Sequence, residues 1–131
     1  MKVVFDTNVL ISGFITTTGP SAYALSLAFR RHEVVLSDYI LSEFERKLIG
    51  KLRFPKEGVR TAVSFLLGRC TQVKLQKLPK IQFSDSKDIP ILEMLAVLKP
   101  HYFITGDKQL LKMKKQGSTV FLSPREAMEI L

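Results

Sequence analysis

Short apolar runs alternate along the chain with longer stretches in which apolar residues recur at helical spacing. The runs are rich in β-branched and aromatic residues, which favour strands. They predict strands at residues 2–6, 33–36, 71–75, 102–105 and 119–122. The stretches between them predict helices at residues 8–14, 20–31, 38–49, 55–67, 88–98, 108–115 and from 124 onward, with a loop over 78–87.

Local signals mark several of the predicted helix ends. Pro20 and Pro55 stand at helix starts, where a fixed φ angle and a missing N–H cost little. Ser37 is a predicted N-cap, and Gly50 is the predicted stop of the same helix. The run Ser123-Pro124-Arg125-Glu126 has the capping-box pattern and predicts the start of the last helix.

The alternation of strands and helices predicts an α/β protein with a mostly parallel sheet and helices on both faces. Right-handed crossovers place the carboxyl ends of such strands along one edge. Ligand sites in open sheets lie at that edge. Polar residues that directly follow a strand are therefore the first candidates for chemistry.

Composition narrows the class of protein. The 131 residues predict a single domain spanning 1–131, and 46% apolar residues are enough for a core. One cysteine and two histidines exclude an intrachain disulfide and a zinc site of four Cys and His ligands, and favour a reducing, cytoplasmic location. Asp6 and Asn8 interrupt the apolar N-terminus, so we expect no signal peptide, and no stretch is long enough for a membrane span. The net charge of +8 favours a polyanionic partner such as nucleic acid.

Two acids directly follow predicted strands. Asp6 ends the first strand, and Asp107 follows the strand at 102–105, so both should lie at the carboxyl edge of the sheet. A turn or helix cap would explain either residue taken alone. Asp88 begins a predicted helix and shares the apolar stripe of Ile91 and Leu95, where it is either an N-cap or a ligand.

The helix after the second predicted strand carries two further acids. Its apolar face contains Ile40, Phe44 and Leu48, and Glu43 and Glu45 lie on opposite flanks of that face. Periodicity does not choose between them, and a solvated helix surface would explain both. A cluster of carboxylates at one edge would repel itself unless a cation were present, and oxygen ligands suit Mg²⁺ or Mn²⁺. Such a cluster on a basic protein indicates metal-assisted attack on a phosphodiester.

Four segments resemble the motifs of PIN-domain nucleases. They are Val3-Val4-Phe5-Asp6-Thr7-Asn8-Val9-Leu10-Ile11-Ser12, Ser37 with Glu43-Phe44, Asp85-Ser86-Lys87-Asp88-Ile89-Pro90-Ile91-Leu92, and Tyr102-Phe103-Ile104-Thr105-Gly106-Asp107-Lys108-Gln109-Leu110-Leu111. The order and spacing match over nearly the whole chain. The nearest group is the PIN proteins described as toxin components of prokaryotic toxin–antitoxin pairs.

This resemblance implies a three-layer α/β/α fold and a Mg²⁺- or Mn²⁺-dependent endoribonuclease. Carried over by position, the catalytic and metal-binding acids would be Asp6, Glu43, Asp88 and Asp107. The polar supports near the metal would be Thr7 or Asn8, and Thr105. The resemblance selects Glu43 over Glu45. The chain departs from many relatives by having Gln109 in place of a further Asp and Ile89 in the third motif, where Asp85 ranks below Asp88 as a ligand.

Lys108, Lys112 and Arg46 are the candidates for binding RNA phosphates, because they belong to two basic runs at residues 46–60 and 108–115. Solvated helix surface is the alternative for each. Family resemblance makes an antitoxin and a homodimer the expected protein partners. Two other classes of function stay open: a catalytically weak or inactive RNA-binding or interaction protein on the same fold, and a phosphatase with Asp6 as nucleophile. Asn8 argues against the phosphatase, because an acid is expected at that position.

Overall fold

The computed structural model describes residues 1–75 and 89–131 and contains one sheet with the strand order β3-β2-β1-β4-β6-β5. All neighbouring strands are parallel except β5, which is antiparallel to β6. The strands are β1 (Lys2–Phe5), β2 (Glu33–Ser37), β3 (Thr71–Val73), β4 (Tyr102–Ile104), β5 (Lys115–Gln116) and β6 (Thr119–Leu122). The predicted α/β class and mostly parallel sheet are confirmed.

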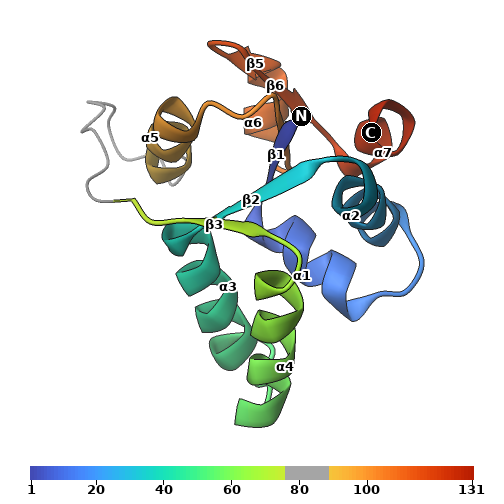
Figure 1. Ribbon diagram of the computed structural model, residues 1–131, viewed down its shortest axis with the longest axis vertical. Coiled ribbons are helices and arrows are strands. Elements are labelled where there is room, and N and C mark those ends of the chain that lie inside the picture. The colour runs from blue at the N-terminus through green and yellow to red at the C-terminus, as the bar shows by residue number, and fades with distance from the viewer. Residues whose placement is uncertain (76–88) are drawn as a thin grey trace.

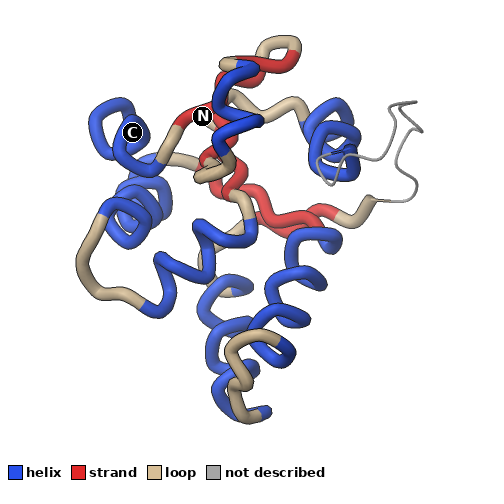
Figure 2. Tube along the Cα trace, turned by 180° about the vertical axis from the view of Figure 1, so that it is seen from behind, coloured by secondary structure: helices blue, strands red, loops and turns tan. Residues whose placement is uncertain are grey.

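Helices flank the sheet, with α2 packed against α7 on one side and α5 across the sheet from them (Figures 1 and 2). Below the sheet in Figure 1, α3 and α4 form a pair that extends away from it. The helices are α1 (Thr7–Ile15), α2 (Pro20–Arg31), α3 (Asp38–Gly50), α4 (Lys56–Leu67), α5 (Ile89–Leu98), α6 (Lys108–Met113) and α7 (Pro124–Ile130). The arrangement is the expected three-layer α/β/α fold.

The core lies on both faces of the central strands. Val3, Val4 and Phe5 of β1 are consecutive and all buried, as expected for a strand covered on both sides. Phe103 of β4 packs edge-on against Phe121 of β6, with 5.7 Å between the ring centroids. This burial fixes the central strands, and therefore fixes the ends from which the acids project.

The capping signals were mostly correct. Ser123 and Glu126 form the predicted capping box, and Ser37 accepts a hydrogen bond from the backbone N–H of Ile40 at the start of α3. Gly50, however, lies inside α3, which is capped by Lys51. Helix α6 also differs from prediction, since it ends at Met113. The described part of α5 runs from Ile89 to Leu98, and its predicted start at Asp88 lies outside the described residues.

The strand β5 was missed in the sequence. The prediction extended a helix through Lys115, but Lys114 has φ 64°, which ends the helix, and Gly117 has φ 58° in the turn that follows. The turn lets Lys115 and Gln116 pair with β6. A lysine in the left-handed region is uncommon, so local propensity gave no sign of this ending. Among the described residues, no helix is long and apolar enough to cross a membrane.

Candidate active site

The site begins where β1 and β4 end side by side. Phe5 pairs with Ile104 in the parallel register, and the ladder continues because the backbone N–H of Asp6 donates to the Ile104 carbonyl at 2.8 Å. The next residue along β4 is Thr105, whose N–H donates to Leu122 of β6 at 2.9 Å. Sheet register therefore places Asp6 next to Thr105, although 99 positions separate them in sequence.

Both oxygens of the Asp6 carboxylate are hydrogen-bonded. Oδ1 accepts from the backbone N–H of Thr7 at 2.8 Å, which makes Asp6 the N-cap of α1. Oδ2 accepts from the Thr105 hydroxyl at 2.7 Å. Thr105 is fully buried, so its side chain is held by packing and orients the carboxylate.

Asp107 is connected to the same threonine. Its backbone N–H donates to Thr105 Oγ1 at 3.0 Å, so the Thr105 hydroxyl donates to one acid and accepts from the backbone of the other. Asp107 Oδ1 accepts from the N–H groups of Gln109 and Leu110 at 2.8 and 3.3 Å and caps α6. Asp6 and Asp107 therefore both cap helices, as one interpretation of the sequence predicted. Capping a helix does not exclude a second role for these carboxylates in binding or catalysis.

Asp6 and Asp107 line one pocket of about 360 Å³ at the carboxyl edge of the sheet. The pocket is formed by the starts of α1, α2, α6 and α7, through Asp6, Asn8, Val9, Ser21, Gly106, Asp107 and Pro124. Two residues predicted from separate motifs are thus brought into one concave site.

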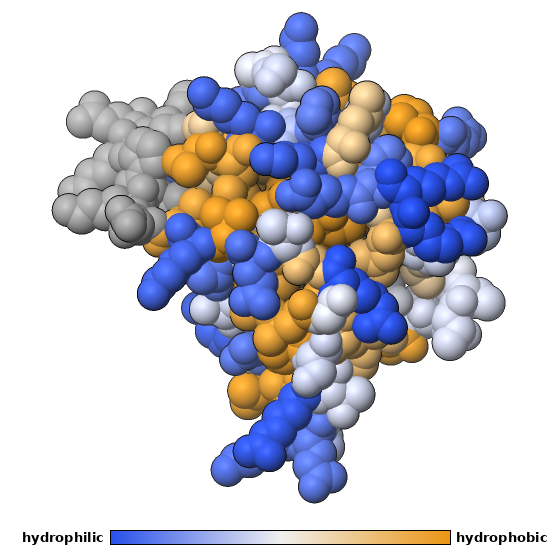
Figure 3. Space-filling model, in the orientation of Figure 1, coloured by the Kyte–Doolittle hydropathy of each residue, from blue (hydrophilic) through white to orange (hydrophobic). Residues whose placement is uncertain are grey.

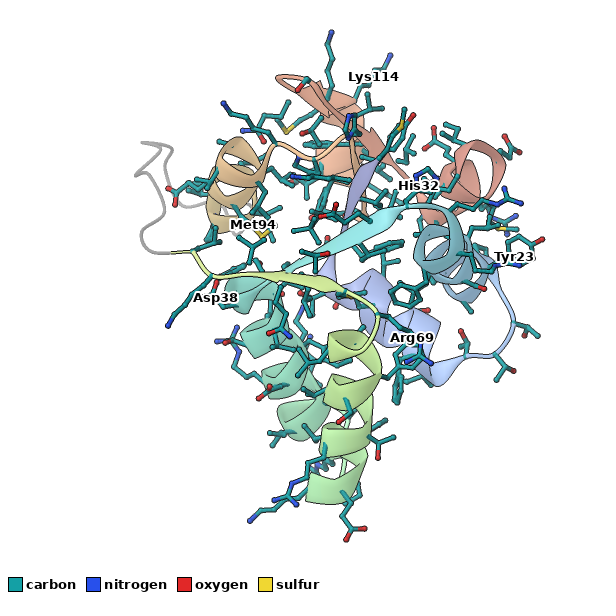
Figure 4. The ribbon with its side chains drawn as sticks, viewed as in Figure 1. Tyr23, His32, Asp38, Arg69, Met94 and Lys114 are labelled. Atoms are coloured by element: carbon teal, nitrogen blue, oxygen red, sulfur yellow. The ribbon has the colours of Figure 1, made fainter. Side chains whose placement is uncertain are left out.

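Glu43 approaches this site from α3. The start of that helix is fixed by buried Ser37, whose hydroxyl donates to the Met94 sulfur of α5 at 3.0 Å; Met94 is labelled in Figure 4. Glu43 is paired with Lys47 at 3.2 Å and lies near Tyr39, on whose hydroxyl its charge acts. Its charge also acts on Asp6. The structure therefore places Glu43 on the side of the helix facing Asp6.

The electrostatics of the site are unfavourable for an isolated carboxylate at Asp6. Burial raises the pKa of Asp6, and the negative charge of Glu43 raises this pKa further. Hydrogen bonds from Thr105 and Thr7 and the positive charge of Lys47 oppose the rise. Burial and Glu43 also raise the pKa of Tyr39 to about 12, so its hydroxyl is neutral at ordinary pH.

The predicted polar supports lie in different environments. Thr105 contacts both acids as described, and Asn8 is exposed, with its Oδ1 accepting from Lys47 Nζ at 3.0 Å. Thr7 reaches Asp6 through its backbone N–H; its buried hydroxyl has no hydrogen-bond partner within residues 1–75 and 89–131. Asp88 and Asp85 lie outside the described residues.

Sequence reasoning missed the stripe formed by Tyr39, Glu43 and Lys47. These residues are spaced by four along α3, so their side chains share one helix face. Tyr39 and Lys47 hold Glu43 between them. The spacing was visible in the sequence. That this face turns toward Asp6, and not the face with Glu45, depends on tertiary packing.

The candidate phosphate-binding residues are exposed. Arg46 lies on α3 near Tyr39, on which its charge acts, and Lys108 is the first residue of α6, next to Asp107. Lys112 lies about 6 Å further along α6 at 1.5 Å per residue. Hydrophilic side chains form the lower tip of the molecule in Figure 3, where α3 and α4 extend from the sheet, and hydrophobic side chains lie beside them. Lys114 lies beyond α6 (Figure 4).

The donor chemistry of the site fits a hard divalent cation. Carboxylate oxygens are the ligands that Mg²⁺ and Mn²⁺ prefer, and burial together with the negative charge of Glu43 makes the ionised form of Asp6 costly. Within the part of the chain that the structure describes, no three Asp, Glu, His or Cys side chains are gathered as a complete metal-binding group. The described residues thus supply oxygen donors and an electrostatic reason for a cation.

These features define an α/β protein with an acidic pocket at the carboxyl edge of a parallel sheet. The chain belongs to the PIN-domain family, whose model matches residues 2–109 and whose members are generally nucleases. The matched part contains Asp6, Glu43 and Asp107. The resemblance found in the four motifs is confirmed.

A solved structure shares the fold. It is the crystal structure of VapBC2 from Rickettsia felis bound to a DNA fragment from their promoter. The similarity covers 94% of this chain and 98% of that chain, with a TM-score of 0.66 and 14% sequence identity. No curated protein matches the sequence.

Proposed function

We propose that the protein is a Mg²⁺- or Mn²⁺-dependent endoribonuclease and the toxin of a toxin–antitoxin pair. The observation that carries the proposal is that two acids from separate motifs meet in one pocket, with the charge of a third acting on one of them. Asp6 and Asp107 line one pocket and contact one threonine, and the charge of Glu43 acts on Asp6. Membership of a family of nucleases supports hydrolysis of a nucleic acid backbone.

The acids are the proposed metal ligands. Asp6, Glu43 and Asp107 would hold the ion together with Asp88, which lies outside the described residues. A bound Mg²⁺ or Mn²⁺ would supply an activated water and positive charge at the phosphodiester. The burial that makes an ionised Asp6 costly also strengthens its attraction for a cation.

The neighbouring residues hold these acids in place. Thr105 orients Oδ2 of Asp6, and the N–H of Thr7 orients Oδ1. Tyr39 and Lys47 hold Glu43 from two sides. Such supporting contacts preorganise a site, because the carboxylates need not reorient when a ligand arrives.

RNA phosphates would be bound by exposed cations around the pocket, with Lys108, Arg46 and Lys112 as the proposed contacts. The net charge of +8 supports a polyanionic substrate. The antitoxin and a second copy of the chain are the proposed protein partners. The resemblance to PIN toxins supports both partners, and the fold shared with the VapBC2 chain supports the antitoxin.

The first test is cleavage of end-labelled structured and unstructured RNAs in Mn²⁺, in Mg²⁺ and in EDTA. We expect metal-dependent cutting by the wild type and a loss of more than about 100-fold in Asp6→Asn, since even the residues that support metal ligands contribute 10–100-fold. Circular dichroism of Asp6→Asn controls for folding. Cutting that persists in EDTA or in Asp6→Asn would remove the proposed mechanism.

A non-catalytic RNA-binding protein is the second candidate. It is favoured by one observation, that the acids described do not form a complete metal-binding group. A titration of melting temperature with Mn²⁺ separates the two candidates, because a ligand that binds the folded state stabilises it. RNA binding without cutting, and without a Mn²⁺-dependent rise in melting temperature, would support the second candidate.

A further inference from the structure

Lys47 lies at the edge of the acidic site. Lys47 extends from α3 toward the start of α1, where its Nζ lies 3.0 Å from Asn8 Oδ1 and 3.2 Å from Glu43 Oε1. Its side chain is only 25% exposed, although lysine on a surface helix normally extends into water. Two contacts from two helices therefore fix the position of this ammonium group.

The contact between Lys47 and Glu43 is enough to compensate the charge of Glu43, so the contact with Asn8 is not needed for that purpose. The pair between Glu43 and Lys47 has the common i, i+4 spacing of a helix surface, and such a pair stabilises little. Asn8 is neutral and provides no compensating charge, but its bond with Lys47 crosses to another helix. The second contact therefore positions the ammonium group.

The ammonium group of Lys47 lies beside the pocket, because its partner Asn8 lines that pocket together with Asp6 and Asp107. The charge of Lys47 also acts on Asp6. An ammonium group has three N–H donors, and its bonds to Asn8 and Glu43 use two of them. Within residues 1–75 and 89–131, Asn8 and Glu43 are the partners of Nζ, and the third donor has none among these residues.

We propose that Lys47 binds a phosphate of the RNA that enters this pocket, with Asn8 and Glu43 holding its ammonium group in place. The proposal rests on the proposed function. A phosphate that approaches Asp6, Glu43 and Asp107 meets three negative groups, so a fixed cation among them favours its binding.

The decisive experiment measures RNA binding without cleavage. Fluorescence anisotropy of a labelled single-stranded RNA is measured in Mn²⁺ with the Asp6→Asn protein as the parent. Lys47→Met is compared with Lys51→Met, which removes the same charge from an exposed lysine four residues further along. Lys47→Arg keeps the charge.

We expect Lys47→Met to weaken RNA binding about tenfold, as for loss of a charge-assisted hydrogen bond. The slope of log affinity against log salt should fall by about 0.7, the change expected for one phosphate contact on a single strand. Lys51→Met should bind within about twofold of the parent, and Lys47→Arg should recover part of the loss. In the catalytically intact chain, Lys47→Met should raise KM more than it lowers kcat.

Each outcome decides the proposal. Equal binding and equal salt slopes for Lys47→Met and Lys51→Met would show that Lys47 only compensates the acids. If the intact chain does not cleave RNA, the proposed function fails, and the binding comparison still decides whether Lys47 contacts phosphate. If neither the parent nor the intact chain binds RNA, both proposals fail. Melting curves of all variants exclude unfolding as the cause of a loss.

Discussion

Two units of this molecule have the same local design and different surroundings. In β1–α1 and in β4–α6, a buried strand leads to an aspartate that caps the next helix. Asp6 has both carboxylate oxygens bonded, one of them to buried Thr105. Within the described part of the chain, Asp107 has hydrogen bonds to Oδ1 alone, both from backbone N–H groups of its own helix.

The difference shows that capping and reactivity come from different levels of structure. Both caps follow from local sequence, because aspartate after a strand satisfies the free N–H groups of a helix start. Burial raises the pKa of Asp6, and Glu43 adds to the rise. α1 packs against α2 and α3, whereas α6 is a short helix with an exposed first residue. Tertiary packing therefore makes the ionised form of Asp6 costly.

Among the substitutions that test this comparison, Thr105→Val should have the largest effect on cleavage and stability together, because it removes the hydroxyl that joins the two units. Asp6 Oδ2 would lose its donor, and the N–H of Asp107 would lose its acceptor. We expect metal-dependent cleavage to fall about 10–100-fold and the free energy of unfolding to fall by about 1–3 kcal/mol. Cleavage rates and chemical denaturation measure the two effects.

Thr119→Val is the matched control for that change. Thr119 is also buried, and its hydroxyl donates to the Pro100 carbonyl at 2.6 Å, at the amino end of β6 and away from the pocket. The Thr119→Val variant should be less stable than the wild type, with little change in the rate of cleavage per folded molecule. Equal losses of cleavage in the two variants would mean that stability, and not the orientation of Asp6, explains the effect of Thr105→Val.

At Asp107 the effects on stability and on cleavage can be separated, and the effect on stability should be smaller than that of Thr105→Val. Asparagine caps a helix about as well as aspartate, whereas alanine costs about 1 kcal/mol. Asp107→Asn should therefore unfold at the same denaturant concentration as the wild type, and Asp107→Ala should be less stable by that amount. Both should lose cleavage if the carboxylate binds the metal. If Asp107→Asn retained cleavage, Asp107 would act only as a helix cap.

The sequence was sufficient for most of the fold because its signals are local. Consecutive apolar residues predicted β1, and the pattern at Ser123 predicted the start of α7. The failures occurred where a residue departs from its usual conformation. Lys114 ends α6 with a positive φ angle, and β5 exists only because it can pair with β6.

For a similar reason, some residues of the candidate site could be predicted from the sequence and others could not. Asp6 and Asp107 follow strands, so the rule for parallel sheets was enough to expect them at one edge. Glu43 could not be chosen over Glu45 from periodicity, since the choice depends on how α3 rotates against α1. The places of Tyr39 and Lys47 depend on the same rotation. Asp88 lies outside the described residues and stays a prediction.

The smallest effect is a change in how stability depends on pH, measured on the metal-free protein in EDTA. The raised pKa of Asp6 means that the folded state holds a proton to higher pH than the unfolded state. Wild-type stability should therefore fall as pH rises from the usual pKa of aspartate through the raised pKa, because the folded state binds more protons there. The amide side chain of the Asp6→Asn variant does not titrate, so the variant should gain stability relative to the wild type across that interval.

Melting curves at pH 4 and pH 7 test this expectation, with Asp107→Asn as the control for the same acid-to-amide change at the other cap. The Thr105 hydroxyl can accept as well as donate, so an amide at position 6 can keep a hydrogen bond to it. Asp6→Asn should then be at least as stable as the wild type at pH 7, with a smaller advantage at pH 4. A loss of stability that is the same at both pH values would mean that the hydrogen bonds of the Asp6 carboxylate outweigh the cost of burying its charge. In that case the β1–α1 and β4–α6 units would differ less than their surroundings indicate.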